Sequence, residues 1–113
     1  EFEDDFILPV WDKKADPSWF GFLLTIKNTA KFKRNDLLKF LNNRKIGTRL
    51  LFAGNITRQP YFKNYKIDYR ISGELKNTDE IMNNCFWIGV YPGLNKEMLD
   101  YIIKSFKEFF PHS

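Results

Sequence analysis

The sequence predicts an α/β (α+β) fold, a two-layer sandwich in which a small mixed sheet carries helices on one face. Three apolar runs rich in aromatic and branched residues are the expected strands: 19–27, 48–52 and 86–91. Three stretches with helical periodicity lie between or after them: 35–44, 77–84 and 95–110. The chain has 113 residues, of which 43% are hydrophobic and 28% charged, and this composition is typical of one globular domain.

Two regions are expected along the chain, an N-terminal arm at 1–17 and a packed domain at 18–113. Pro9 and Pro17 interrupt the arm, and its apolar residues 7–11 favour contact with a neighbouring surface. The sequence begins without Met, which suggests that the chain is part of a longer protein.

The first strand, 19–27, is almost continuously apolar, as in strands that are buried on both faces. In the helix at 35–44, Asn35 is the expected N-cap, and Leu37 and Leu41 belong to the buried stripe. If the strands on either side of this helix pair in parallel, the connection is right-handed, whereas a hairpin insertion gives a mixed sheet.

The second strand, 48–52, is followed by a polar and aromatic connection that runs to residue 77. A loop of this length in a compact domain is usually functional or folded over a neighbour. Asn77 or Thr78 begins the next helix, and Asn95 caps the last one, whose apolar residues recur at i, i+4 and i+8.

Aromatic residues make up 18% of the chain, which is more than one small core usually needs. We expect part of this aromatic surface to dock against another domain, with residues 7–11 and 61–69 as the candidates. The net charge of +4 is dispersed, and it fits solubility as well as it fits an anionic ligand.

The chain lacks the residues that several classes of function need. Cys85 is the only cysteine and His112 the only histidine, which excludes an internal disulfide, a zinc site with the usual ligand count and a Cys–His nucleophilic pair. Adjacent carboxylates point apart, so we expect no catalytic residue in the chain. A lone cysteine favours a reducing compartment. No run is apolar and long enough to span a membrane, and the acidic N-terminus lacks the apolar region of a signal peptide.

The candidate binding residues surround the glycine break that ends the second strand: Arg49, Phe52, Asn55 and Arg58. Loops at strand ends commonly carry ligand contacts in α/β proteins. The guanidinium of Arg49 can bind a diphosphate or carboxylate through two parallel hydrogen bonds, Asn55 can bond a sugar or base edge, and Phe52 can stack on a planar ligand. Each also has an ordinary structural interpretation as a strand, turn or core residue.

Phe20, Gly21 and Phe22 suggest a different class of function. Aromatics that alternate around a glycine on a strand resemble the first ribonucleoprotein motif of RNA-recognition domains. The basic residue that precedes the glycine in that motif is missing, and the strand comes earlier than that fold places it. A stand-alone RNA-binding module is therefore the alternative from another class.

Four further segments carry a specific pattern: IGTRLLFAGN at 46–55, RQP at 58–60, NTDEIM at 77–82 and FWIGVYPGL at 86–94. Together they resemble the C-terminal part of sugar-nucleotide dehydrases in the DegT/DnrJ/EryC1/StrS family of pyridoxal-phosphate-type sugar aminotransferases. Aminotransferases of this family typically carry a His-Tyr pair shortly after the equivalent of Arg49. This chain has Leu51 and Phe52 there, which favours the dehydrase branch and leaves a sugar aminotransferase as the alternative.

The resemblance implies that the chain is the C-terminal small domain of a fold type I enzyme that makes deoxysugars for lipopolysaccharide. In such dehydrases, pyridoxamine or pyridoxal phosphate is the electron sink for loss of the C3 hydroxyl of a CDP-hexose, and an iron–sulfur cluster and a reductase then supply electrons. The catalytic base, the cofactor-binding residues and the cluster cysteines lie upstream in the family. The resemblance therefore implies no cofactor or metal residue in this chain, and Cys85 alone cannot hold a cluster.

The partners implied by the resemblance follow from the same family. They are a CDP-sugar substrate, the absent large domain, a second copy in a homodimer and the reductase, with no nucleic-acid or membrane partner. The implied location is cytoplasmic. The isolated chain is not expected to be catalytic.

Overall fold

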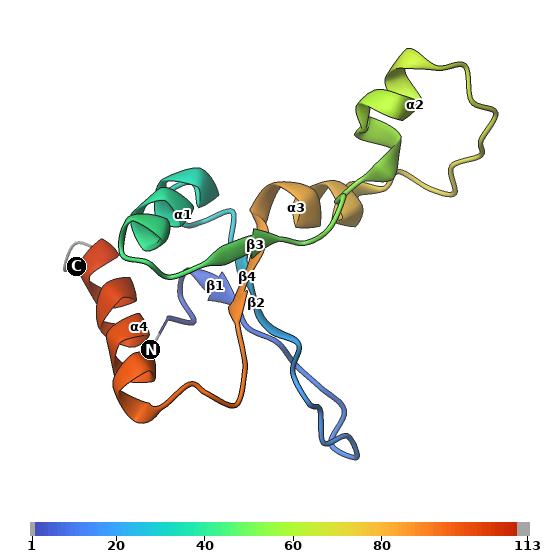
Figure 1. Cartoon of the computed structure of the whole chain (residues 1–113). Helices are drawn as coiled ribbons and strands as arrows, with labels where there is room; N and C mark the ends of the chain where they lie inside the picture. The colour runs from blue at the N-terminus through green and yellow to red at the C-terminus, as the bar shows by residue number, and fades with distance from the viewer. Residues whose placement is uncertain (1, 111–113) are drawn as a thin grey trace.

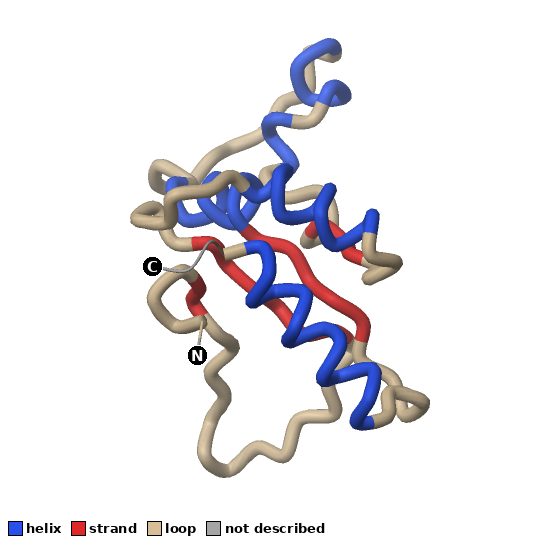
Figure 2. Tube along the Cα trace, turned by 90° about the vertical axis from the view of Figure 1, so that its left-hand side faces the viewer, coloured by secondary structure: helices blue, strands red, loops and turns tan. Residues whose placement is uncertain are grey.

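The computed structural model describes residues 2–110. A four-stranded sheet in the order β1-β2-β4-β3 forms one layer, and α1 and α4 cover one of its faces (Figures 1 and 2). The strands are β1 (Phe6–Ile7), β2 (Gly21–Ile26), β3 (Thr48–Leu50) and β4 (Cys85–Gly89). The helices are α1 (Arg34–Asn43), the 3₁₀ turn η1 (Ile56–Arg58), α2 (Pro60–Asn64), α3 (Lys76–Asn84) and α4 (Lys96–Phe109). The two-layer arrangement expected from the sequence is confirmed.

The strand pairing differs from the expected mixed sheet, because each pair in the described sheet is antiparallel. Strand β4 lies between β2 and β3 and pairs with both. Since both neighbours run opposite to β4, β2 and β3 point in the same direction without touching as a pair. The chain thus contains two parallel strands joined through α1, but the insertion of β4 between them makes the pairing antiparallel.

The core lies between the sheet and the two covering helices. Leu24 of β2 and Phe86 of β4 are partners across the sheet, and both side chains are buried. They pack in one cluster with Leu37 and Leu41 of α1 and with Phe106 of α4. Leu37 and Leu41 are both 0% exposed, which confirms the stripe predicted for this helix.

The N-terminal arm contributes a strand and a core residue. Phe6 of β1 is 1% exposed, and its ring packs edge-on against Phe86 and Phe106. The first part of the arm thus packs with the core, and the boundary expected between residues 17 and 18 stays a prediction. The expected domain end at residue 113 lies outside the described residues.

Residues 56–74 form a projection from the body of the molecule (Figure 1). It contains η1 and α2 where the sequence predicts only a connection, and Pro60 occupies the start of α2, a position at which proline suits a helix. The radius of gyration is 16.6 Å, compared with about 13 Å for a compact chain of this length. Tyr61 and Tyr65 are 62% and 64% exposed.

Exposed aromatic side chains also occur in the N-terminal arm, where Trp11 is 55% exposed. The prediction that residues 7–11 and 61–69 keep aromatic area outside the core is therefore confirmed.

The N-cap predicted from the sequence is found in α4 but not in α1. The Asn95 side chain accepts a hydrogen bond of 2.9 Å from the Met98 backbone N–H, as predicted for the cap of α4. In contrast, the N-cap of α1 is Lys33 and not Asn35. The reason is Arg34, whose Nη1 donates to the carbonyl oxygens of Met82 and Cys85 and so ties the first turn of α1 to the end of α3.

Two leucines in helices test the position of the core. Leu41→Ala is expected to lower the free energy of unfolding by about 2–5 kcal/mol, because this side chain is fully buried and its loss leaves a cavity. Leu99→Ala in α4 is the matched control, since Leu99 is 46% exposed, and it should cost less than about 1 kcal/mol. Urea unfolding of both variants measures the difference, and equal losses would contradict the placement of Leu41.

Candidate functional site

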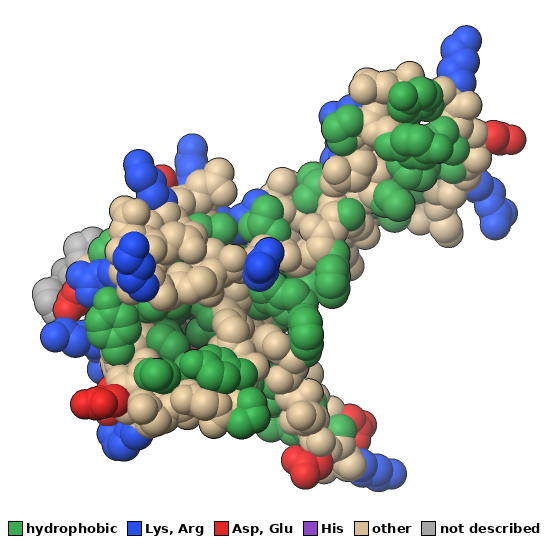
Figure 3. Space-filling view, in the orientation of Figure 1, with side chains coloured by type: hydrophobic (Ala, Val, Ile, Leu, Met, Phe, Trp, Pro, Cys, Tyr) green, Lys and Arg blue, Asp and Glu red, His purple; other side chains and the backbone are tan. Residues whose placement is uncertain are grey.

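The face of the sheet opposite α1 and α4 carries a groove of about 650 Å³, which we call the sheet groove. Its walls come from four places in the chain: the start of β2 with the residue before it, strand β3 with the residue before it, the turn after β3, and strand β4. Figure 3 shows hydrophobic side chains gathered along the side of the body that faces away from these helices, next to the projection. The groove therefore lies on a sheet surface that this chain leaves open.

Trp87 forms the floor of the sheet groove. It stands opposite Arg49 of β3 in the strand register, and its indole leans over Gly21 of β2. A Cβ added at Gly21 would come within 2.9 Å of Cε3 of Trp87, so the glycine lets the ring lie against the backbone of β2. The indole Nε1 is buried without a hydrogen-bond partner among residues 2–110, which leaves the ring and not its N–H for contacts in the groove.

Two exposed phenylalanines stand on either side of this floor. The ring centroids of Phe20 and Phe52 lie 5.1 and 5.4 Å from that of Trp87. The side chains are 81% and 79% exposed. Strand β3 ends at Leu50, earlier than predicted, so Phe52 belongs to a turn and not to the strand core.

The backbone of this turn is held in an unusual conformation. Phe52 has φ of 47°, in the left-handed region that residues with a side chain rarely adopt. Gly54 has φ of 63°, and a Cβ there would lie 2.3 Å from Cγ of Met82 in α3. The close approach of the turn to α3 thus requires glycine and fixes the direction in which Phe52 leaves the backbone.

Arg49 is the cation at the edge of the sheet groove. Its side chain is exposed on β3, and within the described chain it makes no ion pair or side-chain hydrogen bond. A guanidinium in this state has all its N–H donors available for a carboxylate or phosphate.

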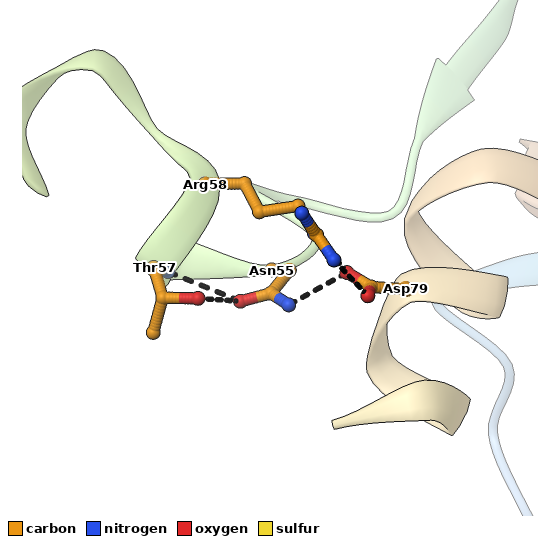
Figure 4. A network of polar contacts seen from close by, with 4 residues as sticks. All are labelled: Asn55, Thr57, Arg58 and Asp79. Atoms are coloured by element: carbon orange, nitrogen blue, oxygen red, sulfur yellow. Dashed lines mark hydrogen bonds and ion pairs between the residues drawn. The ribbon is translucent and has the colours of Figure 1, made fainter. Parts of the chain in front are cut away.

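Asn55 and Arg58 lie in a separate polar network, which Figure 4 shows. The Asn55 side chain is buried; its Nδ2 donates to Asp79 at 2.7 Å, and its Oδ1 accepts from the backbone N–H and hydroxyl of Thr57 at 3.1 and 2.7 Å. Arg58 donates from Nε and Nη2 to the two carboxylate oxygens of Asp79. The network fixes η1, at the base of the projection, to α3.

Asp79 is the centre of this network, and its ionisation reflects it. Hydrogen bonds from Arg58, and then from Asn55, lower the pKa of the Asp79 carboxyl to about 2. The same hydrogen bonding by Asp79 raises the pKa of Arg58. Both groups are therefore charged over the physiological pH range.

The structure divides the four predicted site residues into two pairs. Arg49 and Phe52 line the sheet groove together, whereas the polar groups of Asn55 and Arg58 are taken up by Asp79 and Thr57. Whether any of the four contacts a ligand stays a prediction.

The sequence interpretation missed three groove residues: Phe20, Gly21 and Trp87. It considers Phe20 and Gly21 as part of the first strand and of an RNA-recognition motif, and Trp87 only as part of the segment 86–94. The signal was present, because glycine between aromatics on a strand indicates a place where a large ring approaches the backbone. Only the pairing of β2 with β4 shows which ring that is.

The lining of the sheet groove does not fit a pyridoxal phosphate site. It contains no lysine, histidine or carboxylate to hold the ring nitrogen or the carbonyl carbon of that cofactor. No group of three or more metal-binding side chains occurs among the described residues, and Cys85 is buried beside the Thr25 hydroxyl at 2.8 Å. Among those residues, none of the helices is both long and apolar enough to cross a membrane.

Comparison with known proteins places the chain in a family. A profile of the DegT/DnrJ/EryC1/StrS aminotransferase family matches residues 1–107. The chain belongs to this family. It is 61% identical over 103 residues to the lipopolysaccharide biosynthesis protein RfbH of Salmonella typhimurium, and 50% identical over 103 residues to dTDP-4-dehydro-2,6-dideoxy-D-glucose 3-dehydratase of Saccharopolyspora spinosa. These alignments cover 91% of this chain but only 23% and 22% of the relatives, so the chain spans about a quarter of their length.

Solved structures of the family share the fold. Escherichia coli GDP-4-keto-6-deoxy-D-mannose-3-dehydratase with bound hydrated PLP superimposes with a TM-score of 0.75 at 26% identity, over 92% of this chain and 26% of that one. DesV of S. venezuelae in complex with a ketimine intermediate gives a TM-score of 0.72 at 19% identity, over 93% of this chain and 26% of that one, a likeness of fold alone. The expected membership in a family of PLP-dependent enzymes is thereby confirmed.

The Asp79 network predicts how stability responds to acid. Because the pKa of Asp79 is lowered in the folded state, its ion pair stabilises the fold above about pH 4, and this contribution is lost as the pH falls toward about 2. Asp79→Asn lacks it at every pH. The two proteins should therefore differ most in free energy of unfolding near neutral pH and converge in acid.

Urea unfolding over a range of pH measures this convergence. Asp100→Asn is the matched control, because Asp100 forms an exposed pair with Lys96 on α4 and its replacement should change stability by less than about 1 kcal/mol. A difference between Asp79→Asn and the parent that does not shrink in acid would show that the ion pair is not its source.

Proposed function

We propose that the chain is the C-terminal small domain of a sugar-nucleotide 3-dehydrase that uses pyridoxamine or pyridoxal phosphate and makes deoxysugars for lipopolysaccharide. The observation that carries the proposal is the sheet groove, where an unpaired Arg49 and the exposed ring of Phe52 meet in a chain of this family. The relatives support the reaction class, because two of them are named 3-dehydratases and a third a lipopolysaccharide biosynthesis protein. The proposed substrate is a CDP-4-keto-6-deoxyhexose.

The chain contributes to substrate binding in this proposal, and the reacting groups are elsewhere. Arg49 binds the diphosphate through its planar guanidinium, and Phe52 contacts the planar part of the sugar nucleotide. Asn55 and Arg58 act less directly, since their bonds to Thr57 and Asp79 hold the segment that follows Phe52. The cofactor, bound by the rest of the enzyme, supplies the electron sink for departure of the C3 hydroxyl.

Further parts of the proposal concern the longer protein. The absent large domain covers the exposed aromatic residues of the N-terminal arm and the projection, such as Trp11 and Tyr61. An iron–sulfur cluster held upstream and a reductase complete the reaction, in a cytoplasmic homodimer. The proposal includes no nucleic-acid or membrane partner.

A sugar aminotransferase is the second candidate, because the matching family is named for that activity. The two reactions give different products from a 4-keto sugar nucleotide. Replacement of the C3 hydroxyl by hydrogen, after dehydration and reduction, supports the dehydrase, whereas replacement of the 4-keto oxygen by an amino group supports the aminotransferase. Mass spectrometry of the products formed by the longer protein separates them.

The isolated chain of 113 residues should fold without binding the cofactor. It has a complete core, but its groove offers no lysine, histidine or carboxylate to a pyridoxal ring. Circular dichroism should show cooperative unfolding. After incubation with pyridoxal phosphate and dialysis, the protein should show no absorbance band of bound pyridoxal phosphate. A retained band in stoichiometric amount would contradict the proposal that the cofactor is bound outside this chain.

Arg49→Lys tests the diphosphate contact in the longer protein. Lysine keeps the charge but loses the planar pair of donors, so KM for the sugar nucleotide should rise about tenfold with little change in kcat. Arg70→Lys in the exposed part of the projection is the matched control and should leave both constants unchanged. Unchanged KM in Arg49→Lys, or loss of folding without a binding defect, would exclude the role.

A further inference from the structure

Phe20, Phe52 and Trp87 form an aromatic cluster that the hydrophobic core does not explain. The cluster lies on the opposite face of the sheet from the buried residues, and two of its three rings are about four-fifths exposed, at 81% and 79%. Exposed aromatic rings lose the favourable burial that a core position would give them. Their position therefore points to a ligand.

The three rings are arranged as a floor and two walls. The plane of Phe20 is tilted by 60° and that of Phe52 by 72° from the plane of Trp87. One face of the Trp87 ring is against Gly21, so the opposite face is the one turned toward the groove. A flat ring laid on Trp87 is stacked from below and contacted at two edges by the phenyl rings.

Two unfavourable local features of the backbone maintain this arrangement. Gly21 is required under the indole, although glycine in a strand is destabilising relative to alanine. Phe52 is held at positive φ, a conformation that is unfavourable for a residue with a side chain. Neither feature improves the core, so both indicate that the position of the rings matters.

The charge and size of the groove indicate what the flat ring belongs to. Arg49 lies across the strand register from Trp87, so a planar cation adjoins the aromatic floor. The volume of about 650 Å³ lies within the range of small-molecule sites, which is about 300–1,000 Å³. An aromatic floor beside a single free cation matches a nucleobase joined to a diphosphate.

We propose that the sheet groove is the nucleobase subsite of the sugar nucleotide, with the base stacked on Trp87 between Phe20 and Phe52 and the diphosphate on Arg49. This inference rests on the proposed function, and it adds Phe20, Gly21 and Trp87 to the residues that hold the substrate. It also gives a role to the glycine between aromatics at the start of β2.

The groove is expected to discriminate weakly between bases. Stacking tolerates any base because every base has a π-face, whereas selection requires polar groups that reach the base edge. The lining has no carboxylate or side-chain amide, the Thr48 hydroxyl accepts a hydrogen bond from Asn42 of α1 on the other face of the sheet, and the Trp87 N–H is covered. CDP, GDP and dTDP should therefore bind the chain with affinities within about tenfold of one another.

Nuclear magnetic resonance of the indole N–H groups tests the subsite on the chain itself. The chain has three tryptophans and so gives three indole signals, and Trp87→Phe identifies the one from Trp87. Titration with CDP, GDP or dTDP should shift this signal and leave those of Trp11 and Trp19 in place. Pyrophosphate, which lacks a base, should not reproduce the shift.

Matched variants separate stacking from general effects. Phe52→Ala should weaken nucleoside diphosphate binding about tenfold, equivalent to about 1.4 kcal/mol. Gly21→Ala should weaken it as well, because the added Cβ moves the indole. Tyr61→Ala, which removes another exposed ring but from the projection, should bind like the parent. Circular dichroism verifies that each variant is folded.

The outcomes distinguish this inference from the proposed function. If nucleotides leave the Trp87 signal unchanged while the longer protein still converts a sugar nucleotide, the subsite is wrong and the dehydrase proposal stands. If the signal moves but the longer protein has neither activity, the groove binds nucleotides and the proposed reaction is wrong. A Trp87 signal that moves only when the rest of the longer protein is present, and not with any nucleotide, would show that the groove is a domain contact.

Discussion

The alternation of side chains along β4 is the constraint on which both halves of the molecule depend. Phe86 and Trp87 are neighbours in sequence, and in a strand they must point to opposite faces. Phe86 is fully buried against the helices, which anchors the strand and thereby presents Trp87 on the open face. Because β4 is an inner strand that pairs on both sides, a slip of one residue would exchange the two rings and disrupt the core and the groove together.

The polar network around Asp79 performs a different task from the apolar core. It joins two segments that are distant in sequence, the turn after β3 and the first part of α3, through one carboxylate that accepts from both Arg58 and Asn55. Backbone dihedral angles at Phe52 and Gly54 complete this junction. The direction of the projection and the direction of the Phe52 ring are consequently set by the same few contacts.

Features with a local cause were predictable from the sequence, and features with a distant cause were not. The stripe of α1 and the Asn95 cap of α4 follow from residues within one or two helical turns. The start of α1 did not follow, because Arg34 bonds to carbonyl groups almost 50 residues away, at sequence separations of 48 and 51. The predicted mixed sheet failed for the same reason, since no local signal places β4 between β2 and β3.

The candidate site shows the same limit. Arg49 and Phe52 could be selected because a cation and an aromatic residue flank a glycine break within a short stretch. Their assembly with Trp87 over Gly21 depends on strand register, which one sequence does not report. Asn55 was selected because its amide can donate and accept hydrogen bonds. In the structure these bonds go to Asp79 and Thr57, and the sequence does not show that Asp79 lies beside Asn55.

The order of the strands has a consequence for how the chain folds during synthesis. Strand β4, which joins β3 to the rest of the sheet, is the last of the four to leave the ribosome, and contacts such as that between Thr25 and Cys85 span 60 residues. Until β4 emerges, β2 and β3 each expose an unpaired edge and an apolar face. Sheet closure must also overcome the entropy of a long loop, which slows folding and lengthens this exposure. The nascent chain is therefore most vulnerable to aggregation until residues 85–89 have left the ribosome, and a chaperone would act best in that interval.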